Sequence, residues 1–199
     1  MSSYESDVEN DKIDKPSRLN ISLVKYFWDG NPLRKYKQGN IPLYLRSLEV
    51  LRNFSDLELK TFSKYLHVRK FEHNECIFKQ NDLGFGFYFI YEGHVDLCVN
   101  NGEDSRSDAN YLLSLGTHDY FGELALLQED SVRNASAFSK ESTILLGLFK
   151  PDMHDLIVDH PVIGAKFLQS ISIIVAHRLF SVTRELREVK TRLQQLEGK

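Results

Sequence analysis

Two charged residues of opposite sign, Glu123 and Arg133, stand ten positions apart in the middle of the chain. A carboxylate accepts hydrogen bonds from hydroxyl groups, and an arginine forks onto phosphate oxygens with a charge that does not titrate near neutral pH. Between them, residues 124–127 read Leu-Ala-Leu-Leu, a short helix-forming run whose first turn leaves backbone N–H groups available to an anion. Gly122 permits a close backbone approach directly before the acid. This combination suits a ligand that carries both a ribose and a phosphate.

The stretch around these residues resembles the phosphate-binding cassette of the cyclic nucleotide-binding domain family. The family pattern is roughly Phe-Gly-Glu-(Leu/Ile)-Ala-Leu, a short spacer, and Arg-x-Ala. Here it reads Phe-Gly-Glu-Leu-Ala-Leu over residues 121–126 and Arg-Asn-Ala over residues 133–135. The spacer resembles that of bacterial regulators of the catabolite activator family and is one residue longer than in the regulatory subunits of protein kinase A.

The resemblance implies a role for each cassette residue. Glu123 would accept a hydrogen bond from the ribose 2′-hydroxyl, and Arg133 would pair with the cyclic phosphate. Backbone N–H groups would complete the phosphate nest, from Gly122, Leu124, Ala125, Asn134 and Ala135. The C-terminal helix would cover the base, with candidates Phe180, Thr183 and Arg184. The ligand is cyclic AMP or cyclic GMP, since the side chain of Asn134 can donate to or accept from either purine; no cofactor is expected.

The composition indicates a soluble globular protein with a net charge of −3. That charge argues against nucleic acid as the main partner, because DNA-binding surfaces are basic. The N-terminus lacks the basic and apolar regions of a signal peptide, and no apolar run reaches membrane-spanning length. We therefore expect a cytoplasmic protein that contacts no membrane. In that compartment Cys76 and Cys98 are expected to be free, buried thiols.

The pattern of residue types divides the chain into four segments. Residues 1–15 form a disordered acidic tail, residues 16–66 a helical arm, residues 67–161 the β-roll, and residues 162–199 a lid and coiled-coil helix. The arm carries an apolar stretch that includes Trp28, followed by the basic residues Arg34, Lys35 and Lys37. This stretch either docks a partner or packs onto the main domain.

Helices are expected on both sides of the β-roll. Apolar spacing predicts one helix over residues 42–54, and the capping-box pattern Ser-Asp-Leu-Glu at 55–58 predicts another that runs to about Leu66. Residues 152–160 include His154, Asp155, Asp159 and His160, which we interpret as a solvated helix face rather than a metal site because nothing completes a ligand set.

Short strand-like runs separated by Gly and Asn predict a β-roll, which makes the fold α+β with an antiparallel, jelly-roll-like sheet. The expected strands are 68–71, 76–78, 86–91, 94–100, 111–115 and 142–149, with a polar hairpin loop over 101–110. Two positions depart from the family pattern. Asn81 replaces a glycine and should still adopt a left-handed conformation. Thr117 and His118 replace a glycine before the cassette, so the conformation of that loop is open.

From Val162 the chain reads as one long helix with a heptad stripe. Its members alternate four and three residues apart: Val175, Leu179, Val182, Leu186, Val189, Leu193 and Leu196. In a parallel pair Glu185 would face Lys190 of a second copy, and Arg192 would face Glu197. We name this stripe the seam and expect it to form a homodimer or a higher oligomer, while the helix around Ile173 and Ile174 packs on its own β-roll. The alternative is a seam packed within its own chain.

These features predict a non-catalytic cyclic nucleotide sensor that signals to an unidentified protein partner. In the catabolite activator family a DNA-binding helix-turn-helix follows the dimerising helix; this sequence stops at Lys199, at the end of the seam, so DNA binding is not expected. Three alternatives are a ligand-free structural β-roll for oligomerisation, a truncated-type transcriptional regulator and a β-roll enzyme. The last needs a catalytic set, and the sequence has neither the His-x-His pattern of cupins nor a local Ser-His-Asp arrangement.

Overall fold

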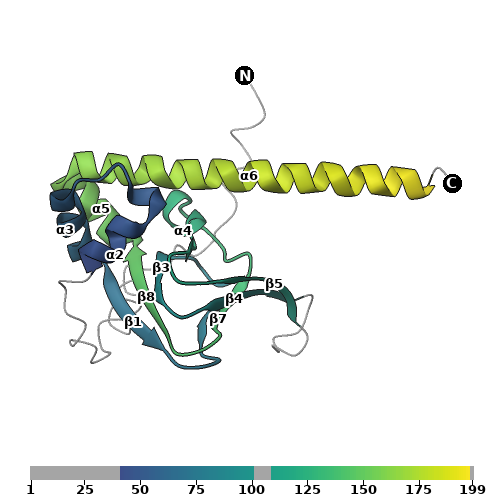
Figure 1. Cartoon of the computed structure of the whole chain (residues 1–199), viewed down its shortest axis with the longest axis horizontal. Coiled ribbons are helices and arrows are strands. Elements are labelled where there is room, and N and C mark those ends of the chain that lie inside the picture. Colours follow the sequence, from purple (N-terminus) through teal and green to yellow (C-terminus); the bar gives the residue numbers. More distant parts are fainter. Residues whose placement is uncertain (1–40, 101–108, 198–199) are drawn as a thin grey trace, which may run out of the picture.

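The computed structural model describes residues 41–100 and 109–197, and it combines two β-sheets with a helical layer (Figure 1). One long helix runs across the molecule, short helices gather at its N-terminal end, and the sheets lie beneath it. The expected α+β architecture with an antiparallel β-roll is therefore confirmed. The acidic tail, the first part of the arm and most of the hairpin loop over 101–110 lie outside the described residues.

Eight strands form two four-stranded antiparallel sheets, ordered β1-β8-β3-β6 and β2-β7-β4-β5. Their bounds are β1 His67–Phe71, β2 Cys76–Phe78, β3 Gly86–Glu92, β4 Val95–Asn100, β5 Ala109–Leu115, β6 Tyr120–Phe121, β7 Ser136–Ser139 and β8 Thr143–Phe149. Six of these coincide with the expected strands to within two residues. Strand β7 was not expected, because Ser-Ala-Phe-Ser follows the cassette without a turn signal and alternates too briefly to be recognised.

The inner faces of the two sheets enclose an aromatic core. Phe71, Tyr88, Phe121 and Phe149 are all at most 5% exposed and belong to one buried cluster with Val95. Aromatic rings bury large areas and therefore contribute strongly to the stability of such a core. Because β6 supplies Phe121 and pairs with β3, which supplies Tyr88, this core fixes the strand that leads into the cassette.

The helical layer contains α2 Ile41–Ser47, η1 Glu49–Leu51, α3 Asp56–Phe62, η2 Ser63–Tyr65, α5 Lys150–Asp159 and α6 Pro161–Glu197. The single helix expected over 42–54 is wrong, because Leu48 adopts an extended conformation and separates α2 from the 3₁₀ turn η1. The break leaves Leu45, Leu48 and Leu51 all buried, so core packing rather than helix propensity decides it. The capping box at Ser55 and Glu58 is confirmed.

The first half of α6 packs on both the short helices and the β-roll. Phe167 and Ile171 are fully buried, and the Phe167 ring lies 4.8 Å from that of Phe62 and 5.7 Å from that of Phe87. Lys166 Nζ donates to both carboxylate oxygens of Glu58 at 2.7 and 2.8 Å. The helical layer and the sheets therefore share one core through α6.

The second half of α6 extends beyond the β-roll (Figure 1). The six seam residues from Leu179 onward are 52–73% exposed, whereas Val175 is partly buried against the core. Among the described residues α6 is also the one helix that could cross a bilayer by length and composition, over Pro161–Leu196. A third of its most apolar window is buried inside the protein, and length and composition alone assign no membrane segment.

The expectation that the helix around Ile173 and Ile174 packs on its own β-roll is confirmed, because Phe167 and Ile171 share a buried cluster with β3 and β8. Ile174 is 6% exposed, but Ile173 is 52% exposed. Successive helical residues lie about 100° apart, so only one of the two can face the core.

Candidate functional site

The cassette begins with a tight turn between β6 and the four-residue helix α4 Leu124–Leu127. Gly122 has φ +83°, in the left-handed region that glycine adopts without steric cost. A Cβ at this position would lie 2.8 Å from both Arg133 Nη1 and the Gly86 carbonyl oxygen. The glycine therefore allows the backbone and the Arg133 guanidinium to approach each other closely.

Arg133 is held in the interior, with 6% of its surface exposed. Its Nη2 donates to the Gly86 carbonyl at 2.9 Å and lies 3.4 Å from the Tyr88 hydroxyl, while the guanidinium stacks 4.0 Å from the centre of the Phe78 ring. Burial lowers the pKa of Arg133, and the nearby Tyr88 oxygen partly opposes this shift. No ion pair to Arg133 is found among residues 41–100 and 109–197. The buried guanidinium therefore has no carboxylate bonded to it within these ranges.

Glu123 is also 6% exposed and faces the long helix. Its Oε1 accepts a hydrogen bond of 2.6 Å from Nη1 of Arg178, whose Nη2 donates to the Tyr120 carbonyl at 3.0 Å. A bidentate arginine on one carboxylate oxygen and one backbone carbonyl fixes both groups. Arg178 therefore ties α6 directly to the cassette.

Glu123 and Arg133 line the same cavity of about 180 Å³, together with Arg178. Two buried polar atoms of these lining residues have no hydrogen-bond partner within the described part of the chain, Glu123 Oε2 and Arg133 Nε. Buried polar groups are normally paired, because an unpaired group loses its hydration without compensation. One orphan acceptor and one orphan donor at a shared cavity are what a ligand with a hydroxyl and an anionic oxygen would satisfy.

Backbone contacts hold the cassette loop in place from both ends. Arg133 exchanges hydrogen bonds with the β2–β3 turn: its N–H donates to the Asp82 carbonyl, and its carbonyl accepts from Asn81. Asn81 has φ +69°, which confirms the expected left-handed conformation. Lys150 Nζ donates to the Gln128 carbonyl at 2.6 Å and closes the loop after α4.

The loop that enters the cassette also has a defined conformation, at a position where the sequence departs from the family pattern. His118 takes φ +76°, its N–H donates to the Ile90 carbonyl, and its ring stacks on that of Tyr44 with centroids 5.4 Å apart. Tyr44 also donates its hydroxyl to the Ile90 carbonyl at 2.7 Å. Helix α2 thereby supports a histidine in a conformation that usually requires glycine.

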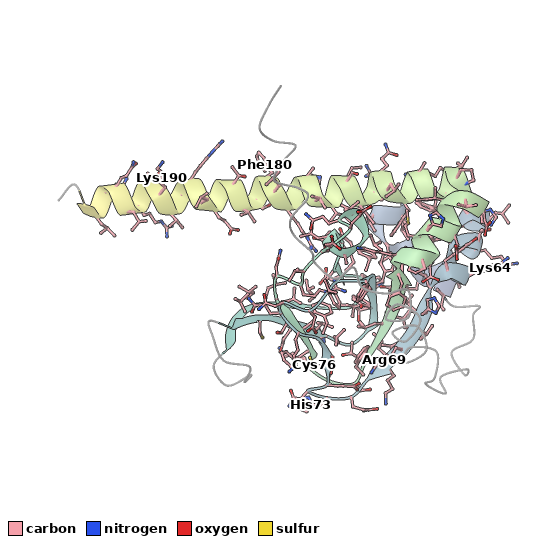
Figure 2. All side chains as sticks on the ribbon, turned by 180° about the vertical axis from the view of Figure 1, so that it is seen from behind. Lys64, Arg69, His73, Cys76, Phe180 and Lys190 are labelled. Atoms are coloured by element: carbon pink, nitrogen blue, oxygen red, sulfur yellow. The ribbon has the colours of Figure 1, made fainter. Side chains whose placement is uncertain are left out.

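The cavity includes all of the cassette residues expected at the site, and the lid residues lie elsewhere. Its lining contains Gly122, Glu123, Leu124, Ala125, Arg133, Asn134 and Ala135. The N–H of Ala125 already donates to the Gly122 carbonyl. Phe180, Thr183 and Arg184 line a separate groove on α6, and Figure 2 shows Phe180 on the side facing away from the β-roll.

Arg178 is the site residue that sequence reasoning missed. It lies two positions before Phe180, and a helix turns by about 200° over two residues, so it faces the cassette when Phe180 faces solvent. Its position beside seam residue Leu179 made it one of several basic residues on the helix. Only the packing of Phe167 and Ile171 on the core identifies which side of α6 faces Glu123.

The candidate residues of types that can bind a metal ion lie on the surface at α5. His154, Asp155, Asp159 and His160 are exposed on or just after α5, and no group of three metal-ligating side chains is found within the described ranges. Within the described residues neither Cys76 nor Cys98 forms a disulfide; Cys98 is buried, and Cys76 is half-buried rather than fully buried.

Comparison with known proteins assigns the fold and the cassette to a family. The sequence profile of the cyclic nucleotide-binding domain matches residues 68–160. This part of the chain is similar to the cyclic nucleotide-binding domain family. The match covers every strand except the first residue of β1 and includes the whole cassette.

Curated relatives with a cyclic nucleotide-binding domain come from bacteria and eukaryotes. The chain is 34% identical over 123 residues to the cyclic AMP receptor protein of Thermus thermophilus, covering 61% of this chain and 53% of that protein. It is 31% identical over 86 residues to a regulatory subunit of cAMP-dependent protein kinase from Dictyostelium discoideum, covering 43% and 26% respectively. The chain thus spans about half the length of the first relative and a quarter of the second.

Solved structures of cyclic nucleotide-binding domains share the fold. The catabolite activator protein of Thermus thermophilus is 29% identical with a TM-score of 0.61, over 71% of this chain and 62% of that one. The regulatory domain of Toxoplasma gondii PKA with cAMP has a TM-score of 0.59 at 19% identity, over 75% and 52%. The second likeness concerns the fold alone.

Proposed function

We propose that this protein is a non-catalytic cyclic nucleotide sensor that binds cyclic AMP or cyclic GMP and passes its ligand state to a protein partner. One observation carries the proposal. A buried acid, Glu123, and a buried arginine, Arg133, line one cavity, and each presents a polar atom without a partner among the described residues. The names of the relatives, a cyclic AMP receptor and a kinase regulatory subunit, support the same ligand class.

The two side chains bind different parts of the ligand. Oε2 of Glu123 accepts from a ribose hydroxyl, while Oε1 stays on Arg178. The cyclic phosphate lies against the Arg133 guanidinium and the backbone at the start of α4. A phosphate supplies the negative charge that Arg133 lacks in the interior, and it would offset part of the cost of burying the cation.

Calorimetric titration tests this proposal and the choice of base. We expect one ligand per chain with cyclic AMP or cyclic GMP, and much weaker binding of 5′-AMP and of a cyclic dinucleotide. A ligand at a hundred times its dissociation constant should also stabilise the folded chain by about 2.7 kcal/mol. Absence of heat and of thermal stabilisation with every nucleotide would instead favour the ligand-free structural β-roll.

The output of the sensor is proposed to travel through α6. Arg178 joins this helix to the ligand-facing acid, and the exposed seam begins at the next residue, Leu179. We expect the seam to form a homodimer, since apolar heptad positions left in water favour association. The protein partner then reads the arrangement of the paired helices. A cytoplasmic location and the absence of DNA and membrane contacts remain predictions.

A further inference from the structure

A second cavity, larger than that of the cassette, lies elsewhere in the described part of the chain. It has a volume of about 590 Å³ and lies between η1, α6 and the ends of β5 and β6. Its apolar walls are Val50, Leu115, Tyr120, Ile173 and Ile174. A volume of this size is typical of sites that enclose a sizeable apolar group.

One apolar residue of the cavity wall, Ile173, is exposed to solvent. Ile173 is 52% exposed, although it stands next to the buried Ile174 and faces the side chains of η1 across the cavity. Burying the exposed part of an isoleucine side chain stabilises a fold. The cavity is therefore suited to an apolar segment that would cover Ile173.

The chain contains such an occupant before α2. Residues 19–28 read Leu-Asn-Ile-Ser-Leu-Val-Lys-Tyr-Phe-Trp, with seven apolar residues in ten, and they lie outside the described residues. A stretch of this composition is typical of a protein core and is costly to expose. Its position just before the elements that build the cavity makes it available at high local concentration.

The length of the connecting chain allows the contact. The 12 residues 29–40 join this stretch to Ile41 and can span at most about 40 Å. Helix α2 is about 10 Å long, and η1 follows it after one residue. The cavity lies well within reach.

We propose that the apolar stretch 19–28 of the same chain packs into the cavity between η1 and α6, with Trp28 against Ile173. The occupied cavity would press on the segment of α6 that ends in Arg178, which lines both this cavity and the cassette. The N-terminal arm would thus act as an internal brace for the helix that carries the signal. This inference does not depend on nucleotide binding.

The fluorescence of Trp28, the sole tryptophan of the chain, tests the contact in the full-length protein. In the parent we expect a blue-shifted emission maximum and protection from acrylamide. Ile173→Lys and Val50→Lys, on opposite walls, should each shift the emission to longer wavelength and raise quenching to that of a free tryptophan peptide. Val162→Lys, a control at an exposed apolar position of α6 away from the cavity, should leave both unchanged.

Circular dichroism confirms that each variant is folded before its emission is interpreted. Leu186→Glu, which should separate the seam, distinguishes an occupant from the same chain from one supplied by a second copy. We expect the blue shift to survive in Leu186→Glu at all concentrations. The proposal is overturned by a solvent-exposed Trp28 in the parent, by a blue shift that persists in both cavity variants, or by a blue shift lost in Leu186→Glu.

Discussion

At the scale of single residues, the neighbours of Arg133 determine how its buried guanidinium is held. Arg133 keeps three contacts that are neutral, with the Gly86 carbonyl, the Tyr88 hydroxyl and the Phe78 ring. Neutral contacts orient a guanidinium without cancelling its charge, so the full electrostatic attraction remains for an incoming anion. An ion pair at this position would have held the arginine equally well and would have competed with the ligand.

We predict that Arg133→Gln weakens nucleotide binding while the chain stays folded. Losing a charge-assisted hydrogen bond to phosphate costs about 1.5–3 kcal/mol, or roughly a ten- to 150-fold rise in dissociation constant. Calorimetric titration measures this change. Arg69→Gln is the matched control, because Arg69 also stacks on a ring, that of Phe71 at 4.4 Å, but does not line the cavity. Equal affinities for both variants and the parent would remove Arg133 from the site.

Gly122→Ala should disturb the same site through the backbone. The new Cβ would need φ +83° and would lie 2.8 Å from Arg133 Nη1. The left-handed conformation alone costs roughly 1–2 kcal/mol, so the melting temperature should fall along with the affinity. Gly116→Ala is the control, because its Cβ meets only the exposed His94 ring at 3.2 Å. Unchanged binding by Gly122→Ala would show that the turn can rearrange without moving the arginine.

At the scale of elements, the contact between α3 and α6 joins two helices of the helical layer. Lys166 donates to both oxygens of Glu58 and to the Asn53 carbonyl, and its hydrogen bonds lower the pKa of Glu58 from the ordinary value of 4.5. A carboxyl group whose pKa is lowered by folding makes its full contribution to stability when the pH is above its ordinary pKa. The contribution disappears as the pH falls through the lowered pKa.

We therefore expect Lys166→Met to reduce the free energy of unfolding by about 1 kcal/mol at neutral pH, a value near the upper limit for partly exposed pairs. Urea unfolding at neutral pH and at about pH 3 measures it, and the gap between variant and parent should narrow in acid as Glu58 becomes protonated. Arg52→Met serves as the control, since Arg52 and Glu49 are 78% and 82% exposed and their pair should contribute almost nothing. A gap that is constant with pH would assign the effect to packing of the lysine stem.

The distal part of α6 is the element that leaves its apolar seam exposed. We predict that Leu186→Glu prevents self-association, because it places like charges opposite each other in a desolvated seam. Analytical ultracentrifugation should find the parent as a dimer or larger and this variant as a smaller species. Thr191→Glu, which adds the same single negative charge at an exposed position off the seam, should keep the mass of the parent. A parent that sediments as a monomer would contradict the seam.

Much of the element order could be predicted from the sequence, and its failures have physical causes. The capping box at Ser55 and the strands bounded by glycine and asparagine depend on local chemistry and appear where expected. The break at Leu48 and the unexpected strand β7 depend on which neighbours bury them, which no local pattern contains. The cassette was readable because its residues are close together in sequence. Arg178 was not, because it reaches Glu123 from 55 positions away.

At the scale of the whole molecule, the proposed function requires the ligand to favour one position of α6 over another. We predict that a protein partner is retained by the immobilised chain to a degree that changes with cyclic nucleotide. Arg133→Gln, as control, should abolish the change but not the basal retention. Residues 177–199 contain six Lys or Arg and three Glu, too mixed for a strong phosphate track, so DNA should not compete. Sequence-specific DNA binding at physiological salt, with no ligand-dependent partner, would contradict this prediction.

The length of α6 gives the Arg178–Glu123 contact a mechanical meaning. From Arg178 to Glu197 the helix continues for 19 residues, or about 28 Å at 1.5 Å per residue. If Arg178 lies near the pivot, a tilt of about 10° there moves the far end by about 5 Å, because a helix of this kind transmits a rigid-body rotation along its axis. In the proposed sensor α6 would then act as a lever, with the cassette contact beside its pivot and a long arm in solvent. A movement of α6 beside the cassette that is no longer than a hydrogen bond would become a displacement about as wide as a side chain at the far end of the helix.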